Sequence, residues 1–330
     1  MITDRGAVAT ILAKQRIELT FQMTVKLVAS SMQVPLPPSA ATESRNTASM
    51  HIDSLTSREI VDLMNSEDAR VAAAVAKESQ QIADAIDVIA ERFRIGGRLI
   101  YMGAGTSGRL GVLDASECPP TFSVPPGMVI GLIAGGRAAL TSAIEGAEDR
   151  REDGLSDLKN TCLTRNDVVM GIASSGRTPY VIGGLEFARK IGAFTIGFAC
   201  NSSSAIAPLS DIMITPVVGP EVVTGSTRLK AGTATKMVLN ILTTGAMVRI
   251  GKTYGNLMVD LTATNEKLKD RSLRIVAELT GLTAIDAREL LLRCDGEVKT
   301  AIVSHLKQVT PVEARTKLLD HQGHLRQALK

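Results

Sequence analysis

The chain has 330 residues, of which 45% are hydrophobic and 22% charged, a composition typical of a globular protein and not of a disordered one. Its net charge of +3 and its 3% of aromatic residues argue against a nucleic-acid-binding protein. Because no apolar run is long enough to span a bilayer, and no signal peptide is recognisable, we expect a cytoplasmic protein without a membrane partner. The four widely spaced cysteines predict reduced thiols and no metal site.

The beginning of the chain differs from the rest. Residues 1–40 contain a mildly apolar stretch followed by three prolines, and we predict a poorly ordered extension. Helical periodicity begins near Ser54, with Ser57 as the predicted N-cap of a first helix. A second helix is predicted from about Asp68 to Arg94.

Five short apolar runs then alternate with helical stretches. They occupy residues 98–103, 128–134, 167–173, 193–198 and 211–216. Buried runs separated by room for crossover helices predict an α/β fold with a doubly wound, five-stranded parallel sheet.

Helical patterns return after the last predicted strand. A long helix is predicted over residues 227–250, and three shorter ones over residues 271–330. We therefore expect a domain of residues 41–268, with N-terminal helices and the sheet, followed by a small three-helix module of residues 269–330.

A glycine-rich loop follows the first predicted strand. Residues 103–108 read GAGTSG, which formally matches a dinucleotide-binding loop. That interpretation requires an acidic residue after the second strand, and residues 133–137 supply none. Phosphate binding needs only a helix N-terminus and nearby hydroxyls, which predicts a phosphate site at Gly105, Thr106 and Ser107.

A second loop with similar chemistry follows the third predicted strand. It contains Ser174, Ser175, Gly176, Arg177 and Thr178 and again leads into a helical stretch. Either loop alone could simply cap a helix. Two such loops at the carboxyl ends of strands point to the edge where α/β sheets bind ligands.

This pairing of loops resembles the sugar isomerase (SIS) domain family of phosphosugar-binding proteins, although Ala173 replaces a Ser that many members carry. Longer stretches are similar to the N-acetylmuramic acid 6-phosphate etherase family, namely residues 98–122, 145–149 and 219–236. The similarity extends over residues 42–330. The third stretch also resembles glucokinase regulatory protein, so that stretch alone does not separate an enzyme from a regulator.

The resemblance implies a reaction and its requirements. Such an etherase, a carbon–oxygen lyase, converts N-acetylmuramate 6-phosphate and water to N-acetylglucosamine 6-phosphate and D-lactate, in the recycling of peptidoglycan amino sugars. Lactate leaves by elimination and water then adds, without a cofactor or a metal. The resemblance also implies a homodimer. Within the C-terminal module, residues 273–306 look similar to a three-helix ubiquitin-associated domain. A non-catalytic phosphosugar sensor and an aldose–ketose isomerase remain alternatives.

Two glutamates are the candidate acid and base. Glu117 precedes two prolines that we expect to end the preceding helix, where the helix dipole and partial burial would favour a protonated carboxyl. Glu148 and Glu145 are three residues apart, which predicts a shared helix face. The residues alone suggest solvated surface carboxylates. The resemblance implies instead that Glu117 is the acid and Glu148 the base.

Polar residues precede the long predicted helix. Ser226 and Thr227 could cap it, or Ser226 could contact the substrate. Arg228, Lys230 and Lys236 could attract the lactyl carboxylate or the phosphate. The sequence leaves these roles undivided.

Overall fold

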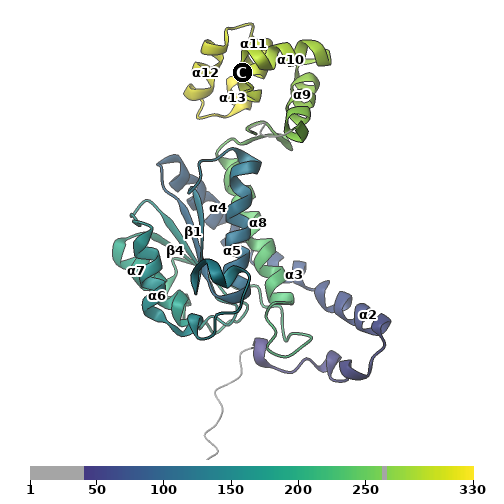
Figure 1. Ribbon diagram of the computed structural model, residues 1–330, viewed down its shortest axis with the longest axis vertical. Helices are drawn as coiled ribbons and strands as arrows, with labels where there is room; N and C mark the ends of the chain where they lie inside the picture. Colours follow the sequence, from purple (N-terminus) through teal and green to yellow (C-terminus); the bar gives the residue numbers. More distant parts are fainter. Residues whose placement is uncertain (1–40, 262–265) are drawn as a thin grey trace, which may run out of the picture. The chain divides into compact units, whose positions relative to one another are not determined.

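The structure, a computed structural model, describes residues 41–261 and 266–330 (Figure 1). The extension predicted for residues 1–40 lies outside the described residues. The centre of the fold is a parallel sheet with the strand order β2-β1-β3-β4-β5. Its strands are β1 (Leu99–Gly103), β2 (Val129–Ile133), β3 (Val168–Ile172), β4 (Phe194–Phe198) and β5 (Ile212–Ile214). The predicted five-stranded parallel sheet is confirmed.

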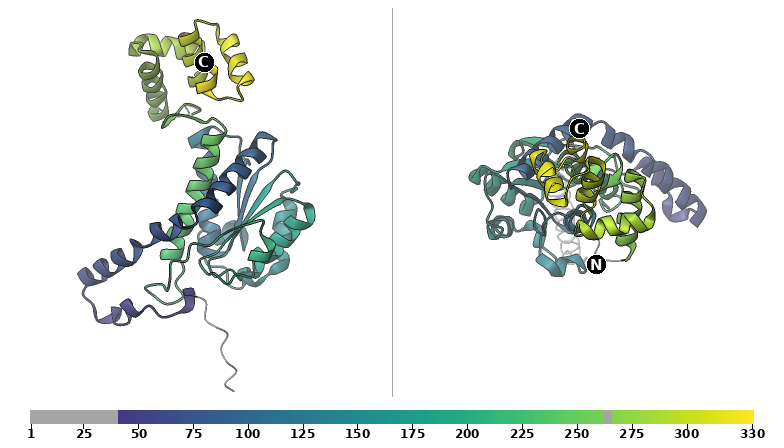
Figure 2. Two further views of the ribbon diagram at one scale, coloured as in Figure 1. Left: turned by 180° about the vertical axis from the view of Figure 1, so that it is seen from behind. Right: turned by 90° about the horizontal axis from the view of Figure 1, so that it is seen from above.

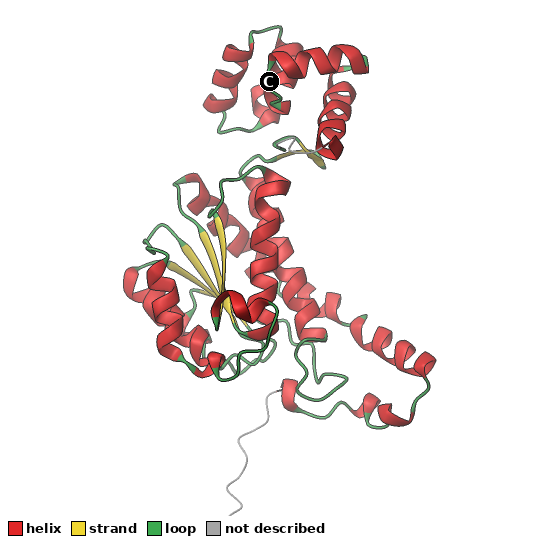
Figure 3. Ribbon diagram, in the orientation of Figure 1, coloured by secondary structure: helices red, strands yellow, loops and turns green. Residues whose placement is uncertain are grey.

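Helices cover both faces of this sheet (Figures 1 and 3). On one face, Leu99 and Tyr101 of β1 contribute to a core with α3, α4, α5 and α8. On the other face, Ile100 and Met102 pack with α6 and α7. Because successive side chains of a strand point to opposite faces, a strand covered on both sides is expected to be mainly apolar. Figure 2 shows the two helical layers from behind. The six helices that cover the sheet are α3 (Val71–Ala76), α4 (Ser79–Arg94), α5 (Gly105–Phe122), α6 (Arg151–Asn160), α7 (Pro179–Ile191) and α8 (Lys230–Arg249).

The helices before the sheet begin and break differently from the prediction. The first, α2 (Ser57–Asp68), is capped by Thr56 and not by Ser57. Thr56 accepts a hydrogen bond from the Glu59 amide, and the Glu59 carboxylate accepts one from the Thr56 amide, forming a capping box. Short 3₁₀ turns precede α2 at Ala41–Glu43, Thr47–Ser49 and Ile52–Ser54.

The prediction of a single helix from Asp68 to Arg94 is also wrong, because α3 and α4 are separate helices. The break lies at Lys77 and Glu78. The Glu78 carboxylate accepts a hydrogen bond of 2.9 Å from the backbone amide of Thr215, which follows β5. A contact to a residue so distant in sequence fixes the break, and no local pattern could reveal it.

The prolines after Glu117 do not end α5. The helix continues through Pro119 and Pro120 to Phe122, and Ser123 then adopts a φ of +48°. Each proline removes one helical N–H and disfavours the helix. Cys118 and Phe122 are nevertheless buried in the core, and their packing keeps the last turn helical.

The C-terminal part has a hydrophobic core of its own, which includes Val259 and Leu261. Five described helices occupy the stretch for which we expected three, because glycines with positive φ, at positions 281, 296 and 323, permit tight turns between them. The elements are a hairpin of β6 (Thr253–Tyr254) and β7 (Leu257–Met258), α9 (Glu266–Thr280), α10 (Ala284–Arg293), α11 (Val298–Lys307), α12 (Pro311–Asp320) and α13 (Leu325–Ala328).

Candidate active site

Two loops meet at the point where the order of the strands reverses. The chain leaves β1 toward β2 on one side of the sheet, whereas β3 leads to β4 on the other side. Gly103 at the end of β1 pairs with Ile172 at the end of β3. The first loop (residues 103–108) and the second loop (residues 174–178) therefore emerge side by side. Open α/β sheets bind ligands at this switch point.

The first loop leads into α5, whose N-terminus lies at this edge of the sheet. Ala104 is the N-cap and contributes no side-chain hydrogen bond, so the first helical N–H groups are free to bind an anion. Gly105 begins the helix with a φ of +52°. At Gly108 a Cβ atom would lie 2.6 Å from the Gly103 carbonyl oxygen, so only glycine lets α5 start so close to the strand. Ser107, in the first turn of the helix, is buried.

The second loop leads into α7, whose N-terminus lies at the same edge of the sheet. Thr178 is the N-cap without a side-chain hydrogen bond, and Pro179 occupies the first helical position. The Ser175 hydroxyl accepts a hydrogen bond of 3.3 Å from the Arg177 amide, while the Arg177 side chain is exposed. Ser174 is buried. Two helix N-termini with hydroxyl groups thus lie at one sheet edge, an arrangement suited to a phosphate group.

Sequence reasoning missed a residue that supports the second loop. Gly176 has a φ of +73°, and its carbonyl oxygen accepts hydrogen bonds from the Ser204 hydroxyl (3.2 Å) and the Ala205 amide (2.9 Å). A Cβ atom at position 176 would lie 2.4 Å from the Ser204 hydroxyl oxygen. The run of serines at residues 202–204 follows β4 at the same sheet edge and was the available signal.

A cavity of about 340 Å³ adjoins the first loop. Gly105 and both glutamates of the 145–148 segment line it. The prediction that Glu145 and Glu148 share a helix face is wrong. Gly146 has a φ of +68°, and residues Ala147–Asp149 form only a short 3₁₀ turn. The Glu148 side chain is exposed to solvent and lines this cavity.

Arg109 also lines this cavity and was not singled out from the sequence. Its guanidinium donates hydrogen bonds to the carbonyl oxygens of Leu140 (3.1 Å) and Ser142 (3.2 Å). Arg109 thereby holds the segment that leads to Glu148 against the beginning of α5. Its position directly after the GAGTSG loop was the only local signal.

Glu117 lines a different cavity, of about 210 Å³. It lies twelve positions after Gly105 on α5, which corresponds to about 18 Å along the helix axis. The prediction that Glu117 is partly buried is wrong for the single chain, because its side chain is exposed. One chain therefore brings Glu148 to the first loop but does not bring Glu117 there.

Lys230 does not have the free ammonium group that a ligand-binding role requires. Its side chain is buried, and its Nζ lies 2.6 Å from the Glu67 Oε2 atom. Burial would raise the pKa of Glu67, but hydrogen bonds from Lys230 and Asn46, with the charges of Lys230 and Arg70, lower it below its usual range. This buried ion pair makes Lys230 a structural residue here.

The other predicted residues of this segment are accessible. Arg228 is exposed and Ser226 is half-buried. Neither Ser226 nor Thr227 caps α8; the carboxylate of the fully buried Glu221 accepts hydrogen bonds from the first two amides of the helix, at 3.0 and 2.9 Å. A Cβ atom at Gly232 would lie 3.5 Å from the Thr106 methyl group, so the first turn of α8 lies beside the first loop.

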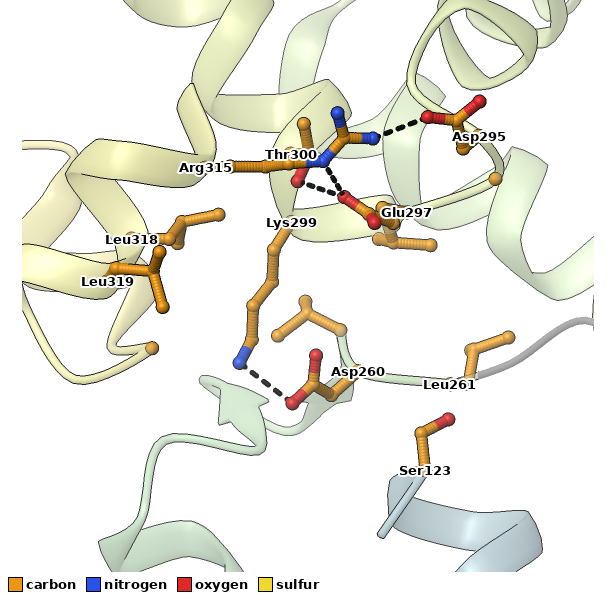
Figure 4. Close-up of a pocket in the computed structure, with 14 residues that line it drawn as sticks. Ser123, Asp260, Leu261, Asp295, Glu297, Lys299, Thr300, Arg315, Leu318 and Leu319 are labelled. Carbon is orange, nitrogen blue, oxygen red and sulfur yellow. Dashed lines mark hydrogen bonds and ion pairs between the residues drawn. The ribbon is translucent and has the colours of Figure 1, made fainter. Parts of the chain in front are cut away.

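A larger cavity, of about 590 Å³, is lined mainly by residues of the C-terminal part (Figure 4). Its charged side chains are paired with one another or with a neighbouring lysine. Arg315 contacts Asp295 and Glu297, and Lys299 contacts Asp260. Because these charges are already neutralised, we place the candidate site at the sheet edge instead.

Residues 41–261 and 266–330 contain neither a metal-binding cluster nor a membrane-spanning helix. Within these ranges, no group of three or more His, Cys, Asp or Glu side chains is arranged to hold a metal ion. The same part of the chain contains no helix that is both long and apolar enough to cross a membrane.

Comparison with known proteins identifies the family. Family models match at residues 81–189 (glucokinase regulatory protein N-terminal SIS domain), 152–245 (SIS domain) and 255–300 (C-terminal lid domain of glucokinase regulatory protein). A protein of Rhodopirellula baltica named N-acetylmuramic acid 6-phosphate etherase is 64% identical over 288 residues, which are 87% of this chain and 95% of that protein. Proteins of the same name from Brucella anthropi (60% identical) and Escherichia coli O9:H4 (56%) match 87% of this chain and 94% and 97% of their own lengths. The chain belongs to the N-acetylmuramic acid 6-phosphate etherase family.

Proposed function

We propose that the protein cleaves the D-lactyl ether at C3 of N-acetylmuramate 6-phosphate with water, giving N-acetylglucosamine 6-phosphate and D-lactate. The observation that carries this proposal is the 64% identity with a relative named for that activity, over 87% of this chain and 95% of that relative. The two uncapped helix N-termini at the switch point support it, because they suit the 6-phosphate.

Binding of the phosphosugar belongs to the loops around the switch point. The N-termini of α5 and α7 lie at the same edge of the sheet, and the loops that lead to them contain hydroxyl and guanidinium groups. We assign substrate or phosphate contacts to Gly105, Thr106, Ser107, Ser174, Ser175, Gly176, Arg177, Thr178, Ser226 and Arg228. Lys230 does not contact the substrate in this proposal, because its ammonium pairs with Glu67.

The chemistry requires a base and an acid. Opening of the sugar ring produces an aldehyde at C1, which makes the C2 proton acidic. Glu148 removes this proton, the C2–H electron pair forms the C2=C3 double bond, and the C3–O bond breaks. Glu117 donates a proton to the departing lactate oxygen. Water then adds at C3, a proton returns to C2, and both carboxyl groups recover their initial states.

A second copy of the chain completes this site in the proposal. Glu117 lies about 18 Å along α5 from the phosphate-binding turn, which is farther than one phosphosugar extends from its phosphate to C3. A homodimer in which Glu117 of one copy faces Glu148 of the other removes this difficulty. We also propose that residues 269–330 form a module that supports this assembly.

The reaction is placed in the cytoplasm, in the recycling of peptidoglycan amino sugars. A 6-phosphorylated sugar fits that compartment because sugar phosphates are charged and do not cross membranes unaided.

Mass spectrometry of the products in ¹⁸O-labelled water tests the reaction. We expect release of unlabelled D-lactate and incorporation of ¹⁸O at C3 of the sugar, because the C3–O bond is the one that breaks. Tight binding of the substrate without lactate release would leave a phosphosugar sensor. A ketose product without lactate would indicate an aldose–ketose isomerase.

Mixing two inactive variants tests the shared site. In a mixed dimer of Glu117→Gln and Glu148→Gln chains, one of the two sites would have both native glutamates. We therefore expect mixing, with exchange of subunits, to restore lactate release. If acid and base belong to the same chain, the mixture remains as inactive as its components.

A further inference from the structure

The cavity beside Glu117 contains more than a single acid. It is formed between α5 and α8, has a volume of about 210 Å³, and is lined by Leu110, Leu113, Asp114, Glu117, Lys236, Leu239 and Asn240. Pockets that hold an entire drug-sized ligand measure roughly 300–1,000 Å³. This cavity therefore suits a fragment of a substrate, with one acidic, one basic and one apolar wall.

The floor of the cavity is rigid. Asp114 is buried, and its carboxylate accepts hydrogen bonds from the Asn240 amide (2.7 Å), the Tyr101 hydroxyl (3.0 Å) and the Thr243 hydroxyl (3.2 Å). Burial raises the pKa of Asp114, while these hydrogen bonds and the charge of Lys236 reduce that rise. The network links β1, α5 and α8, so the two helices that carry Glu117 and Lys236 are held in a fixed register.

Lys236 supplies a positive charge without a direct partner. Within residues 41–261 and 266–330 its ammonium group makes no ion pair and no hydrogen bond, and its side chain is exposed. Lys230, six residues earlier on α8, is buried against Glu67. Of the two lysines at the beginning of α8, only Lys236 can therefore bind an anion that enters the Glu117 cavity.

The substrate of the proposed function carries an anion at the corresponding place. The oxygen that Glu117 is proposed to protonate belongs to the lactyl group, and the lactyl carboxylate is attached to the carbon next to that oxygen. A residue that protonates the ether oxygen must consequently lie close to the carboxylate. The lactyl methyl group is attached to the same carbon and needs an apolar surface, which Leu110, Leu113 and Leu239 provide.

We propose that the cavity lined by Glu117 and Lys236 is the lactyl subsite, in which Lys236 binds the lactyl carboxylate and the leucines accept the methyl group. The inference rests on the proposed function and deepens it. Glu117 faces the ether oxygen, Lys236 the carboxylate and the leucines the methyl group. This arrangement accepts only one configuration of the lactyl carbon. The product sugar lacks the lactyl group and therefore does not bind in this subsite.

A pair of substrates isolates the contact. N-acetylmuramate 6-phosphate and its derivative with a neutral amide in place of the lactyl carboxylate differ only in the charge that Lys236 is proposed to bind. We expect the native protein to prefer the acid in kcat/KM by about 10- to 100-fold, the range of a hydrogen bond between charged groups. In Lys236→Met the preference should fall to near unity, and Lys236→Arg should restore part of it. Lys77→Met, which removes an exposed lysine away from this cavity, is the matched control and should keep the full preference.

The outcomes separate the two levels of the proposal. If the native protein releases no lactate from the acid substrate, the proposed function fails and the lactyl subsite fails with it. If the native protein is active but Lys236→Met lowers turnover of both substrates equally, Lys236 acts on Asp114 or Glu117 and the subsite is overturned. Affinity for N-acetylglucosamine 6-phosphate should be unchanged in Lys236→Met; a loss there would place Lys236 at the sugar or the phosphate instead.

Discussion

The buried ion pair between Lys230 and Glu67 leads to a quantitative prediction. Both side chains are only 2% exposed, and the Lys230 Nζ atom lies 2.6 Å from the Glu67 Oε2 atom. The same carboxylate also contacts the Asn46 amide at 2.8 Å and the exposed Arg70 guanidinium at 3.1 Å. Removal of one partner of a buried ion pair costs about 3–5 kcal/mol of unfolding free energy, because the other charge remains buried.

The two partners are not equivalent. Lys230→Met leaves the Glu67 carboxylate with Asn46 and Arg70, so we expect the lower end of this range, about 3 kcal/mol. Glu67→Leu leaves the Lys230 ammonium without an acceptor among the described residues, so we expect the upper end, about 5 kcal/mol. The double variant buries two apolar side chains instead of two charges and should lie within about 1 kcal/mol of the native protein.

Urea denaturation monitored by circular dichroism measures these differences. A shift of the midpoint with an unchanged slope indicates a change in stability alone. The double variant should also retain lactate release, because Lys230 is not expected to contact the substrate. Two results would refute the reasoning: single variants that lose less than about 1 kcal/mol, or a double variant that is stable but inactive.

Three further predictions concern the site and the sheet. Glu117→Gln and Glu148→Gln should each lower kcat by about 10²-fold or more with little change in substrate affinity, measured by lactate release and calorimetry; near-native kcat in either would exclude that residue. Ser175→Ala should weaken binding of a 6-phosphorylated sugar by about 10-fold, and unchanged affinity would assign the phosphate to other groups. Burial would raise the pKa of Asp167, but hydrogen bonds from Arg98 and Thr164 and the charge of Arg98 lower it below 3.8. Its stabilising contribution is therefore complete above pH 3.8 and is lost as the pH falls through the lower native pKa, so urea midpoints measured from pH 7 to pH 3 should depend less on pH in Asp167→Asn.

The sheet and the two loops at its switch point were predictable because their signals are local. A strand covered by helices on both faces must be mainly apolar, and all five strands have this pattern in the sequence. Glycines and hydroxyl residues directly after β1 and β3 likewise mark loops that open toward helix N-termini. Parallel strands end at one edge, so the sequence also predicted that these loops would meet.

The roles of individual charges depended on contacts between distant segments. Lys230 and Lys236 are both lysines at the beginning of one helical pattern, yet Glu67, 163 positions earlier, neutralises only Lys230. Glu117 and Glu148 are both acidic residues after glycine-rich segments, but the length of α5 places them in different cavities. Helical and strand periodicity reflect burial against any apolar surface. An ion pair or a shared cavity requires particular partners, and only the folded chain determines which side chains those are.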